Sequence, residues 1–391
     1  MATPDSMNLG LKTSLRSAVR QKFASARRSG DLVFSETQLA ILHTRDGVPF
    51  QLRYCPALSK KPKQKAVAGV PVSERNEKAD EKADEKAKAR TRAKDPFDNP
   101  SPELLISETA TGSHILLLNK FPVIPNHFIL ATKTNKPQTH LLEPDDLAVS
   151  YACLRAWREE SRSGGGGDAG DGTPGPEDDG QLLAFFNSGE HSGASQPHRH
   201  IQFVPVSDMR INHTTKWQHP DTFDWNPLPQ SMKSHSHASF TINYTSNILL
   251  PLRHFAMPLR DETPASLHSK YIVLLKLALV STGNPRGIFF NYDKDAKIED
   301  KGEVTFSYNL VMMPDILVIC PRRVESAPIP GLDSAAHSVS VNGTILAGTL
   351  MVKEQQEWDA LRSREGALDD ILETIGFPFG GDSSASNSTR L

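Results

Sequence analysis

Residues 187–206 read NSGEHSGASQPHRHIQFVPV, and this segment decides how the rest of the chain is interpreted. Successive side chains of an extended chain point to opposite faces, so His198, His200 and Gln202 would share one face of a strand. Three ring or amide side chains in a row on one strand face have few structural uses. The segment therefore predicts a β-strand that presents polar groups for chemistry.

The loop before this strand has the composition of an anion-binding turn. Gly189 and Gly193 permit close backbone approach, and consecutive N–H groups make a cradle for phosphate oxygens. Together, loop and strand indicate a nucleotide site. The predicted substrate-binding residues of this segment are Asn187, Gly193, Ala194, Ser195 and Gln196.

Two other interpretations of the histidines remain open at this point. A His-x-His pair taken alone is common on exposed strand faces that have no function. Neutral imidazoles are also frequent metal ligands, and His191 stands close to His198 and His200. No acid or thiol stands at a spacing typical of a fourth ligand, so we expect no tightly bound metal.

The composition excludes several classes of function. The chain has 391 residues and a formal net charge of −2, which gives no global attraction to nucleic acid or to an anionic membrane. The three cysteines contain no CxxC pair, and this argues for a reducing, intracellular setting. No apolar run reaches the about 18 residues of a membrane helix. We expect a soluble, cytoplasmic protein, with the nucleus as a second compartment, and no nucleic-acid or membrane partner.

Residues 7–30 contain an amphipathic pattern. Leu11, Leu15, Val19 and Phe23 recur every four residues, as on one face of a helix. This pattern favours a packed helix over the mitochondrial presequence that the Arg- and Ser-rich composition also fits.

Strand patterns follow, and then a second helix. Asp46-Gly47 between two apolar runs predicts a hairpin, and Pro144 followed by two acids predicts a helix to about Arg162. The predicted strands of this half are 38–42, 50–54, 103–108, 113–119 and 127–133.

Two segments contain almost no core-forming residues. Residues 63–95 include the repeat EKADEKADEKA and predict a solvated helix or a disordered insertion. Residues 163–180 are rich in Gly, Asp and Pro and predict a flexible loop. Both segments look peripheral.

The carboxy-terminal half repeats the order of strands and helix. Thr263 and Pro264 begin a helix to about residue 280 whose apolar residues surround nearly the whole circumference, so we expect it to be buried. Further strands are predicted at 287–292, 303–313, 315–320 and 344–352, with a last helix near 353–375.

These patterns predict an α+β fold of antiparallel sheets with packed helices, in two pseudo-repeated halves. The predicted boundaries are a catalytic half at 1–62 and 96–240, a second half at 241–378 and a disordered tail at 379–391.

The HRHIQ of residues 198–202, within SGASQPHRHIQ, resembles the His-x-His-x-Gln signature of the transferase branch of the histidine-triad superfamily. The chain is similar, more specifically, to fungal-type diadenosine tetraphosphate phosphorylases, also called ATP adenylyltransferases. The resemblance extends to RYCP at 53–56, to LLLNKFPVIPNHFILATK at 116–133 and to SYNLVMMPDILVICPRR at 307–323. It implies a histidine-triad-like fold of the galactose-phosphate uridylyltransferase type.

The resemblance implies roles for the three polar residues of the motif. His200 is the expected nucleophile, and an imidazole near its usual pKa of about 6.5 is largely neutral in the cytosol and keeps a lone pair for phosphorus. His198 is expected to fix the orientation of that ring and to bind phosphate. Gln202 replaces the third histidine of the hydrolases, and its amide is expected to stabilise charge on a non-bridging oxygen.

The implied reaction is phosphorolysis of diadenosine tetraphosphate to ATP and ADP through an adenylyl-histidine, with small-molecule nucleotides and phosphate as partners. Mg²⁺ or another divalent cation is expected with the nucleotide, without a protein cage. Further predicted substrate contacts are Arg53, Asn119, Lys120, Ser307, Tyr308 and Asn309, although Arg53 fits an ordinary surface cation and Tyr308 a core residue equally well. The alternatives are hexose phosphate uridylyl transfer, as in galactose-1-phosphate uridylyltransferase, and a noncatalytic nucleotide sensor.

Overall fold

The computed structural model describes residues 4–59, 95–162, 180–212, 225–233, 250–283 and 302–378. The strand predicted at 287–292, the tail, and all but the last residue of the two low-complexity segments lie outside these ranges. No helix of the described residues is long and apolar enough to cross a membrane.

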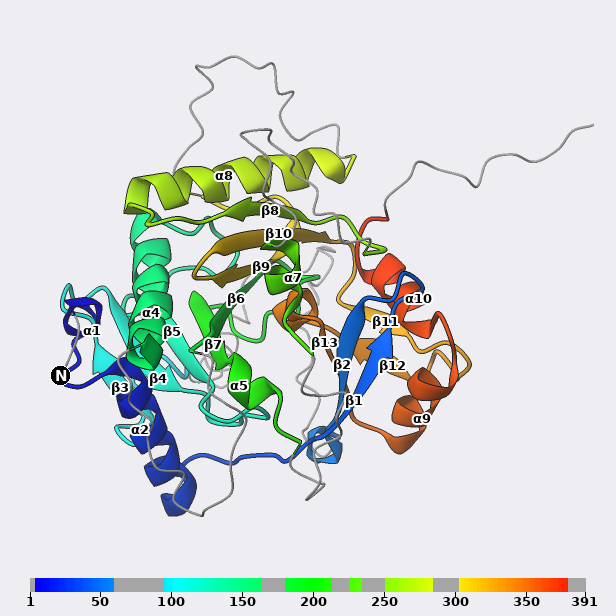
Figure 1. Ribbon diagram of the computed structural model, residues 1–391, viewed down its shortest axis with the longest axis horizontal. Coiled ribbons are helices and arrows are strands. Elements are labelled where there is room, and N and C mark those ends of the chain that lie inside the picture. Colours follow the sequence, from blue (N-terminus) through cyan, green and yellow to red (C-terminus); the bar gives the residue numbers. More distant parts are fainter. Residues whose placement is uncertain are drawn as a thin grey trace, which may run out of the picture.

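An antiparallel sheet dominates the fold (Figure 1). Eight strands of the described residues form it, and every neighbouring pair is antiparallel. Their spatial order is β3 (Leu105–Glu108), β4 (His114–Leu118), β5 (Phe128–Thr132), β7 (His200–Pro205), β6 (Leu182–Ser188), β9 (Ser307–Met313), β10 (Ile316–Arg322) and β8 (Phe255–Pro258). The α+β class with antiparallel sheets is confirmed.

The two halves of the chain contribute matching units to this sheet. In the first unit the chain runs β5, α4 (Pro144–Arg162), β6, β7; in the second it runs β8, α8 (Pro264–Ser281), β9, β10. The spatial order β5-β7-β6 is mirrored by β9-β10-β8, and β6 pairs with β9 where the units meet. The two helices pack against each other. The structure thus shows the duplication that the sequence predicts.

Helices cover one face of the sheet, which we call the helical face. Here α2 (Leu15–Ser29), α4 and α8 bury apolar side chains together with alternate residues of the strands. Phe203 of β7 stacks on Phe128 of β5 at a centroid distance of 4.8 Å, and Phe128 stacks in turn on Trp157 of α4. These contacts fix which side of β7 faces the helices.

The opposite face, which we call the site face, has two separate covers. A small sheet of β1 (Gln38–His43), β2 (Pro49–Tyr54) and β13 (Thr349–Val352) encloses one core with the β6, β9 and β10 side of the large sheet. Phe97 packs over the β4–β5 end with Ile115, Leu117 and Ile129.

The remaining described elements are α1 (Pro4–Asn8), η1 (Pro56–Leu58), α5 (Val206–Met209), α7 (Leu228–Lys233), β11 (Ser326–Pro328), β12 (Ser338–Ser340), η2 (Gly343–Ala347), α9 (Gln355–Ser363) and α10 (Ala367–Ile375).

Most predicted elements are confirmed. The hairpin around Gly47 pairs β1 with β2, and the predicted helix from Pro144 to Arg162 is α4. Thr263 caps α8 as predicted, since its hydroxyl accepts a hydrogen bond from the Ser266 N–H.

Four predictions need correction. The first long helix begins at Leu15 and not near residue 7, because Ser14 caps it. Residues 344–347 belong to the 3₁₀ helix η2 and not to a strand. The predicted helix at 353–375 is two helices, separated at Gly366 by a left-handed backbone (φ 76°). Only one face of α8 is buried, and Val280 is 58% exposed.

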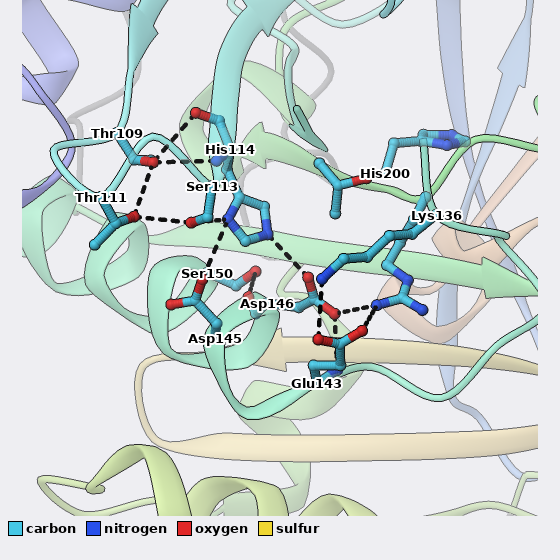
Figure 2. A network of polar contacts seen from close by, with 12 residues as sticks. Thr109, Thr111, Ser113, His114, Lys136, Glu143, Asp145, Asp146, Ser150 and His200 are labelled. Carbon is cyan, nitrogen blue, oxygen red and sulfur yellow. Dashed lines mark hydrogen bonds and ion pairs between the residues drawn. The ribbon is translucent and has the colours of Figure 1, made fainter. Parts of the chain in front are cut away.

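A network of buried polar contacts fastens α4 to the large sheet (Figure 2). Asp146, in the first turn of α4, accepts hydrogen bonds from His114 Nε2 of β4 (2.9 Å) and from the Glu143 N–H (2.7 Å). It also pairs with Arg199 Nη1 at 2.7 Å, and Glu143 accepts from the same nitrogen. The desolvation that would raise the pKa of Asp146 is outweighed by these donors, which hold that pKa below its usual value. Arg199 stands between the two histidines of the motif. This network therefore fixes the start of β7 from the helical face of the sheet.

We expect Asp146→Leu to lower the free energy of unfolding by about 3–5 kcal/mol, because the buried guanidinium of Arg199 loses its buried partner and keeps only the partly exposed Glu143. Asp145→Leu is the matched control: this carboxylate is half exposed and 3.8 Å from His114, so its loss should cost less than about 1 kcal/mol. Urea unfolding of both variants measures the difference. Equal losses would contradict the role given to Asp146.

Candidate active site

The alternation of β7 places the polar residues of the motif on the site face. Ile201 and Phe203 belong to the core of the helical face, so His200 and Gln202 point the other way. In the register with β5, His200 lies opposite Ala131 and Gln202 opposite Ile129. The two polar side chains therefore sit between the Phe97 cluster and the core under the small sheet.

The hydrogen bonds of His200 define its tautomer. Nδ1 lies 2.8 Å from the backbone oxygen of His198, and since a carbonyl oxygen can only accept, Nδ1 carries the hydrogen. Nε2 makes no hydrogen bond within the described residues. The side chain is 3% exposed, and burial lowers its pKa to about 4, so the ring is neutral. A neutral ring protonated at Nδ1 has its free lone pair on Nε2.

Gln138 inserts its side chain between β6 and β7 beside His200. The pairing of these strands ends at Phe185 and Gln202, and continuing the register would pair Asn187 with His200. There Gln138 Nε2 instead donates to the Asn187 oxygen (2.8 Å) and to the His200 oxygen (3.2 Å), while its Oε1 accepts from the His200 N–H (2.8 Å). A side-chain amide thus replaces the backbone ladder, and the strands separate at His200.

His198 is held at both ring nitrogens. Nδ1 donates to the carboxylate of Asp95 (2.8 Å), and Nε2 lies 2.7 Å from the Thr132 backbone oxygen. Nε2 also lies 3.0 Å from the Thr132 hydroxyl, so both ring nitrogens are engaged by neighbouring polar groups. The ring is 1% exposed, and the backbone oxygen of the same residue is the partner of His200 Nδ1. The geometry offers no ring nitrogen for the phosphate contact that the sequence predicted.

Asp95 and Phe97 form a wall beside the two histidines. Asp95 Oδ1 also accepts the Phe97 N–H at 2.9 Å, and the Phe97 ring lies 5.4 Å from the ring of His198 and 5.2 Å from that of His200. The sequence boundary had put Asp95 at the end of a peripheral charged insertion. That boundary is wrong at this residue, because Asp95 belongs to the site.

Gln202 begins a line of hydrogen bonds across three strands. Its Oε1 lies 3.1 Å from His127 Nε2, and His127 Nδ1 lies 3.1 Å from Asn119 Nδ2. Burial lowers the pKa of His127 to about 4. Asn119, predicted to contact substrate, is thus connected to the motif. Its neighbour Lys120 is exposed, with Nζ 5.6 Å from the centre of the Phe121 ring.

The glycine loop is shaped by the carboxy-terminal half. Gly189 has φ +89°, and a Cβ there would lie 2.4 Å from Ser307 Oγ. Ser307 Oγ accepts the His191 N–H at 3.0 Å. The N–H groups of Ser195 and Gln196 donate no hydrogen bond within the described residues. The loop thus presents free N–H groups, as an anion cradle requires.

Asn187 and Asn309 join the two halves at the centre of the sheet. They are paired in the β6–β9 register, and Asn187 Oδ1 accepts from Asn309 Nδ2 (3.0 Å) and from the Gly343 N–H (2.7 Å). Asn309 also accepts from Arg322 and donates to the Ser192 oxygen, so its amide is fully used. Asn187 Nδ2 makes no bond within the described residues, which leaves this donor for a substrate.

Two predicted contact residues lie away from His200. Tyr308 is fully buried on the helical face, where its hydroxyl pairs with that of Tyr271 at 2.7 Å. Arg53 is also fully buried and bonds Thr37 and the Met209 oxygen, and burial lowers its pKa to about 9. Neither side chain is available for a substrate contact in this geometry.

Comparison with known families identifies the chain. A model of the Ap4A phosphorylase N-terminal domain matches residues 7–172 and 177–216, and a model of the ATP adenylyltransferase C-terminal domain matches residues 249–378. The chain belongs to the Ap4A phosphorylase family. It is a nucleotidyltransferase, and hexose phosphate uridylyl transfer is not the activity of the family identified.

Two curated relatives come from Saccharomyces cerevisiae. Diadenosine 5',5'''-P1,P4-tetraphosphate phosphorylase 2 is 26% identical over 378 residues, which is 94% of this chain and 96% of the relative. Protein APA1 is 26% identical over 386 residues, with coverage of 95% and 96%. The crystal structure of yeast Ap4A phosphorylase Apa2 has a TM-score of 0.65 at 23% identity and covers 94% of this chain and 99% of that one. The fold is therefore shared.

Sequence reasoning missed four residues of this phosphorylase-family site: Asp95, Phe97, His127 and Gln138. His127 had a signal, because it begins the strand predicted at 127–133 and alternates with Ile129 on the site face of β5. Gln138 and Asp95 lie in irregular segments, where no periodicity marks them. The described residues contain no group of three or more His, Cys, Asp or Glu that could hold a metal ion.

We expect Gly189→Ala to weaken both the fold and nucleotide binding, because its Cβ would meet the Ser307 backbone at 2.8 Å. Gly30→Ala is the matched control, since Gly30 has nearly the same φ (+85°) but nothing within 4 Å. The control should lose about 1–2 kcal/mol from backbone strain alone. Gly189→Ala should lose more and should also bind nucleotide less tightly in calorimetry; equal stabilities and affinities would contradict this reading of the loop.

Acid should destabilise the fold through the buried histidines. His127 and His200 have a pKa of about 4 when folded and about 6.5 when unfolded, so between these values the unfolded chain binds more protons. The contribution of these neutral rings to the free energy of unfolding is fully present above about pH 6.5 and is lost as the pH falls toward 4. Between pH 7.5 and 5.0, the free energy of unfolding of the wild type should fall by about 2 kcal/mol more than that of His127→Gln. Urea unfolding at both pH values measures this, and identical losses would refute it.

Proposed function

We propose that the chain transfers the adenylyl group of Ap4A to inorganic phosphate through a covalent adenylyl-His200. The observation that carries the proposal is the His200 tautomer: Nδ1–H is committed to the His198 oxygen, and burial keeps the ring uncharged. Nε2 is therefore the nucleophilic atom. The yeast relative named as an Ap4A phosphorylase supports the choice of substrate.

In the first step, Nε2 attacks the phosphorus next to one adenosine. A nitrogen–phosphorus bond forms, the bond from that phosphorus to the bridging oxygen breaks, and ATP leaves with the electron pair. The imidazole becomes positively charged, and its Nδ1–H remains bonded to the His198 oxygen, which now stabilises a cation. Gln138 holds the backbone of the same residue in place.

Charge on the phosphoryl oxygens is met by amide donors. The free N–H groups of Ser195 and Gln196 and the free Nδ2 of Asn187 stand in the segment that leads to the nucleophile, and Gln202 lies two residues beyond it. Such preorganised donors stabilise the transition state more than the ground state. A polyphosphate is a good leaving group, so the amide at position 202 suffices where a proton donor would otherwise be needed.

In the second step, an oxygen of inorganic phosphate attacks the adenylyl phosphorus. The nitrogen–phosphorus bond breaks, its electron pair returns to Nε2, and the product is ADP. The reverse sequence makes Ap4A from ATP and ADP. The partners are thus small nucleotides and phosphate.

We propose further that Mg²⁺ or another divalent cation enters with the polyphosphate, whose oxygens are the ligands such cations prefer. A cytoplasmic location is part of the same proposal. It is supported by three buried free cysteines, Cys55, Cys153 and Cys320, which suit a reducing compartment.

Intact mass spectrometry tests the covalent step. Protein mixed with Ap4A in the absence of phosphate should gain the mass of one adenylyl group and release ATP, and added phosphate should remove the group as ADP. His200→Ala should gain nothing. His268→Leu, which changes a buried histidine of α8 whose Nε2 has no partner, should behave as wild type. A wild-type chain that binds Ap4A without gaining mass would be a sensor, and the proposal would fail.

A further inference from the structure

We propose that His127 is a positioning residue which, with Asn119, fixes the Gln202 amide so that its NH₂ group faces the transferred phosphoryl group. The inference rests on the proposed function, because it assumes that Gln202 stabilises negative charge on the phosphoryl group that is transferred.

Strand register brings the three residues together on the site face. Asn119 follows β4 and lies opposite His127, since the Asn119 N–H donates to the His127 oxygen at 3.0 Å. On β5, Ile129 lies opposite Gln202 of β7. His127 is two residues before Ile129, so it is the diagonal neighbour of Gln202. Diagonal cross-strand pairs on one face are within reach of ring and amide side chains.

The direction of the hydrogen bonds is set by one backbone donor. The Phe121 N–H can only donate, and it lies 2.9 Å from Asn119 Oδ1. Asn119 therefore turns its Nδ2 toward His127 Nδ1, which must accept. A neutral ring that accepts at Nδ1 carries its hydrogen on Nε2, and Nε2–H then donates to Gln202 Oε1. The Gln202 NH₂ group is left free on the other side.

The reversed arrangement places two donors against each other. If Gln202 presented its NH₂ group to His127, the ring would have to accept at Nε2 and donate from Nδ1. Asn119 would then turn its Oδ1 toward the ring and its NH₂ group toward the Phe121 N–H. The Phe121 N–H would lose the Asn119 acceptor and face a second donor, so the chain of bonds has one favoured polarity.

The buried setting of His127 supports this assignment. The side chain is 7% exposed, and burial lowers its pKa to about 4. A protonated ring would present Nδ1–H to the Asn119 NH₂ group, so Asn119 would lose its acceptor. The groups that face the ring are Asn119, Gln202 and the ring of Phe185 at 6.0 Å. None of them carries a charge that would favour protonation, and any positive charge on His200 lowers the pKa of His127 further.

A double-mutant cycle tests the inference. His127→Leu removes the ring hydrogen bonds, Gln202→Ala removes the amide, and the double variant removes both. His127→Leu should lower kcat for Ap4A phosphorolysis about 10- to 100-fold with little change in KM, below the about 10²- to 10³-fold cost of deleting a charge-stabilising donor outright. In the Gln202→Ala background the same change should cost less than about 2-fold, because no amide remains to be oriented.

Rescue and control variants separate positioning from folding. His127→Gln keeps an N–H donor toward Gln202 and should recover most of the lost kcat. His268→Leu, an equally buried histidine on α8, should leave kcat unchanged. A loss on His127→Leu that is as large in the Gln202→Ala background as in wild type would overturn the inference, as would a failure of His127→Gln to recover activity.

The failure of the proposed function has a different signature. If wild type formed no adenylyl-enzyme and released no ADP, the transfer reaction itself would be refuted, and the positioning role would fall with it. If wild type turned over normally and the two losses were additive, only the positioning role would be refuted.

Discussion

The buried ion pair between Arg199 and Asp146 is the constraint on which the site depends. Arg199 stands between His198 and His200, and its guanidinium is drawn to the helical face by a carboxylate at the start of α4. Side chains of a strand alternate, so fixing one residue on the helical face fixes its two neighbours on the other. A slip by one residue would bury both histidines among the helices and expose a cation to the site. The Phe203–Phe128 stack reinforces the same register.

The proposed chemistry lies on only one of the two structural repeats. In the first unit, β7 carries the proposed nucleophile and the glutamine. In the second unit, β9 and β10 contain no histidine, and every residue of both strands is buried. The second unit contributes in another way. Asn309 and Ser307 hold Asn187 and the glycine loop from across the β6–β9 junction. The second unit thus positions residues of the first unit.

The sequence was informative where the chain is periodic. The alternation around His200 predicted the strand and its polar face, and proline followed by acids predicted the start of α4. The sequence could not show that Tyr308 points to the helices, because that depends on where β6 meets β9. Nor could it reveal Asp95 or Gln138, whose partners lie 103 and 62 residues away and are brought near only by tertiary packing. Arg53 illustrates the same limit, since a cation beside a hairpin reads as exposed until the small sheet closes over it.

The contact between Gly189 and Ser307 links assembly of the molecule to its activity. The loop that offers free N–H groups adopts its left-handed turn against a residue from the other half, 118 positions along the chain. An isolated amino-terminal half would contain the whole signature motif, but it would lack Ser307, against which the glycine loop packs. We therefore expect nucleotide binding to require both halves of the chain. The loop takes its shape only where the second repeat docks on the first.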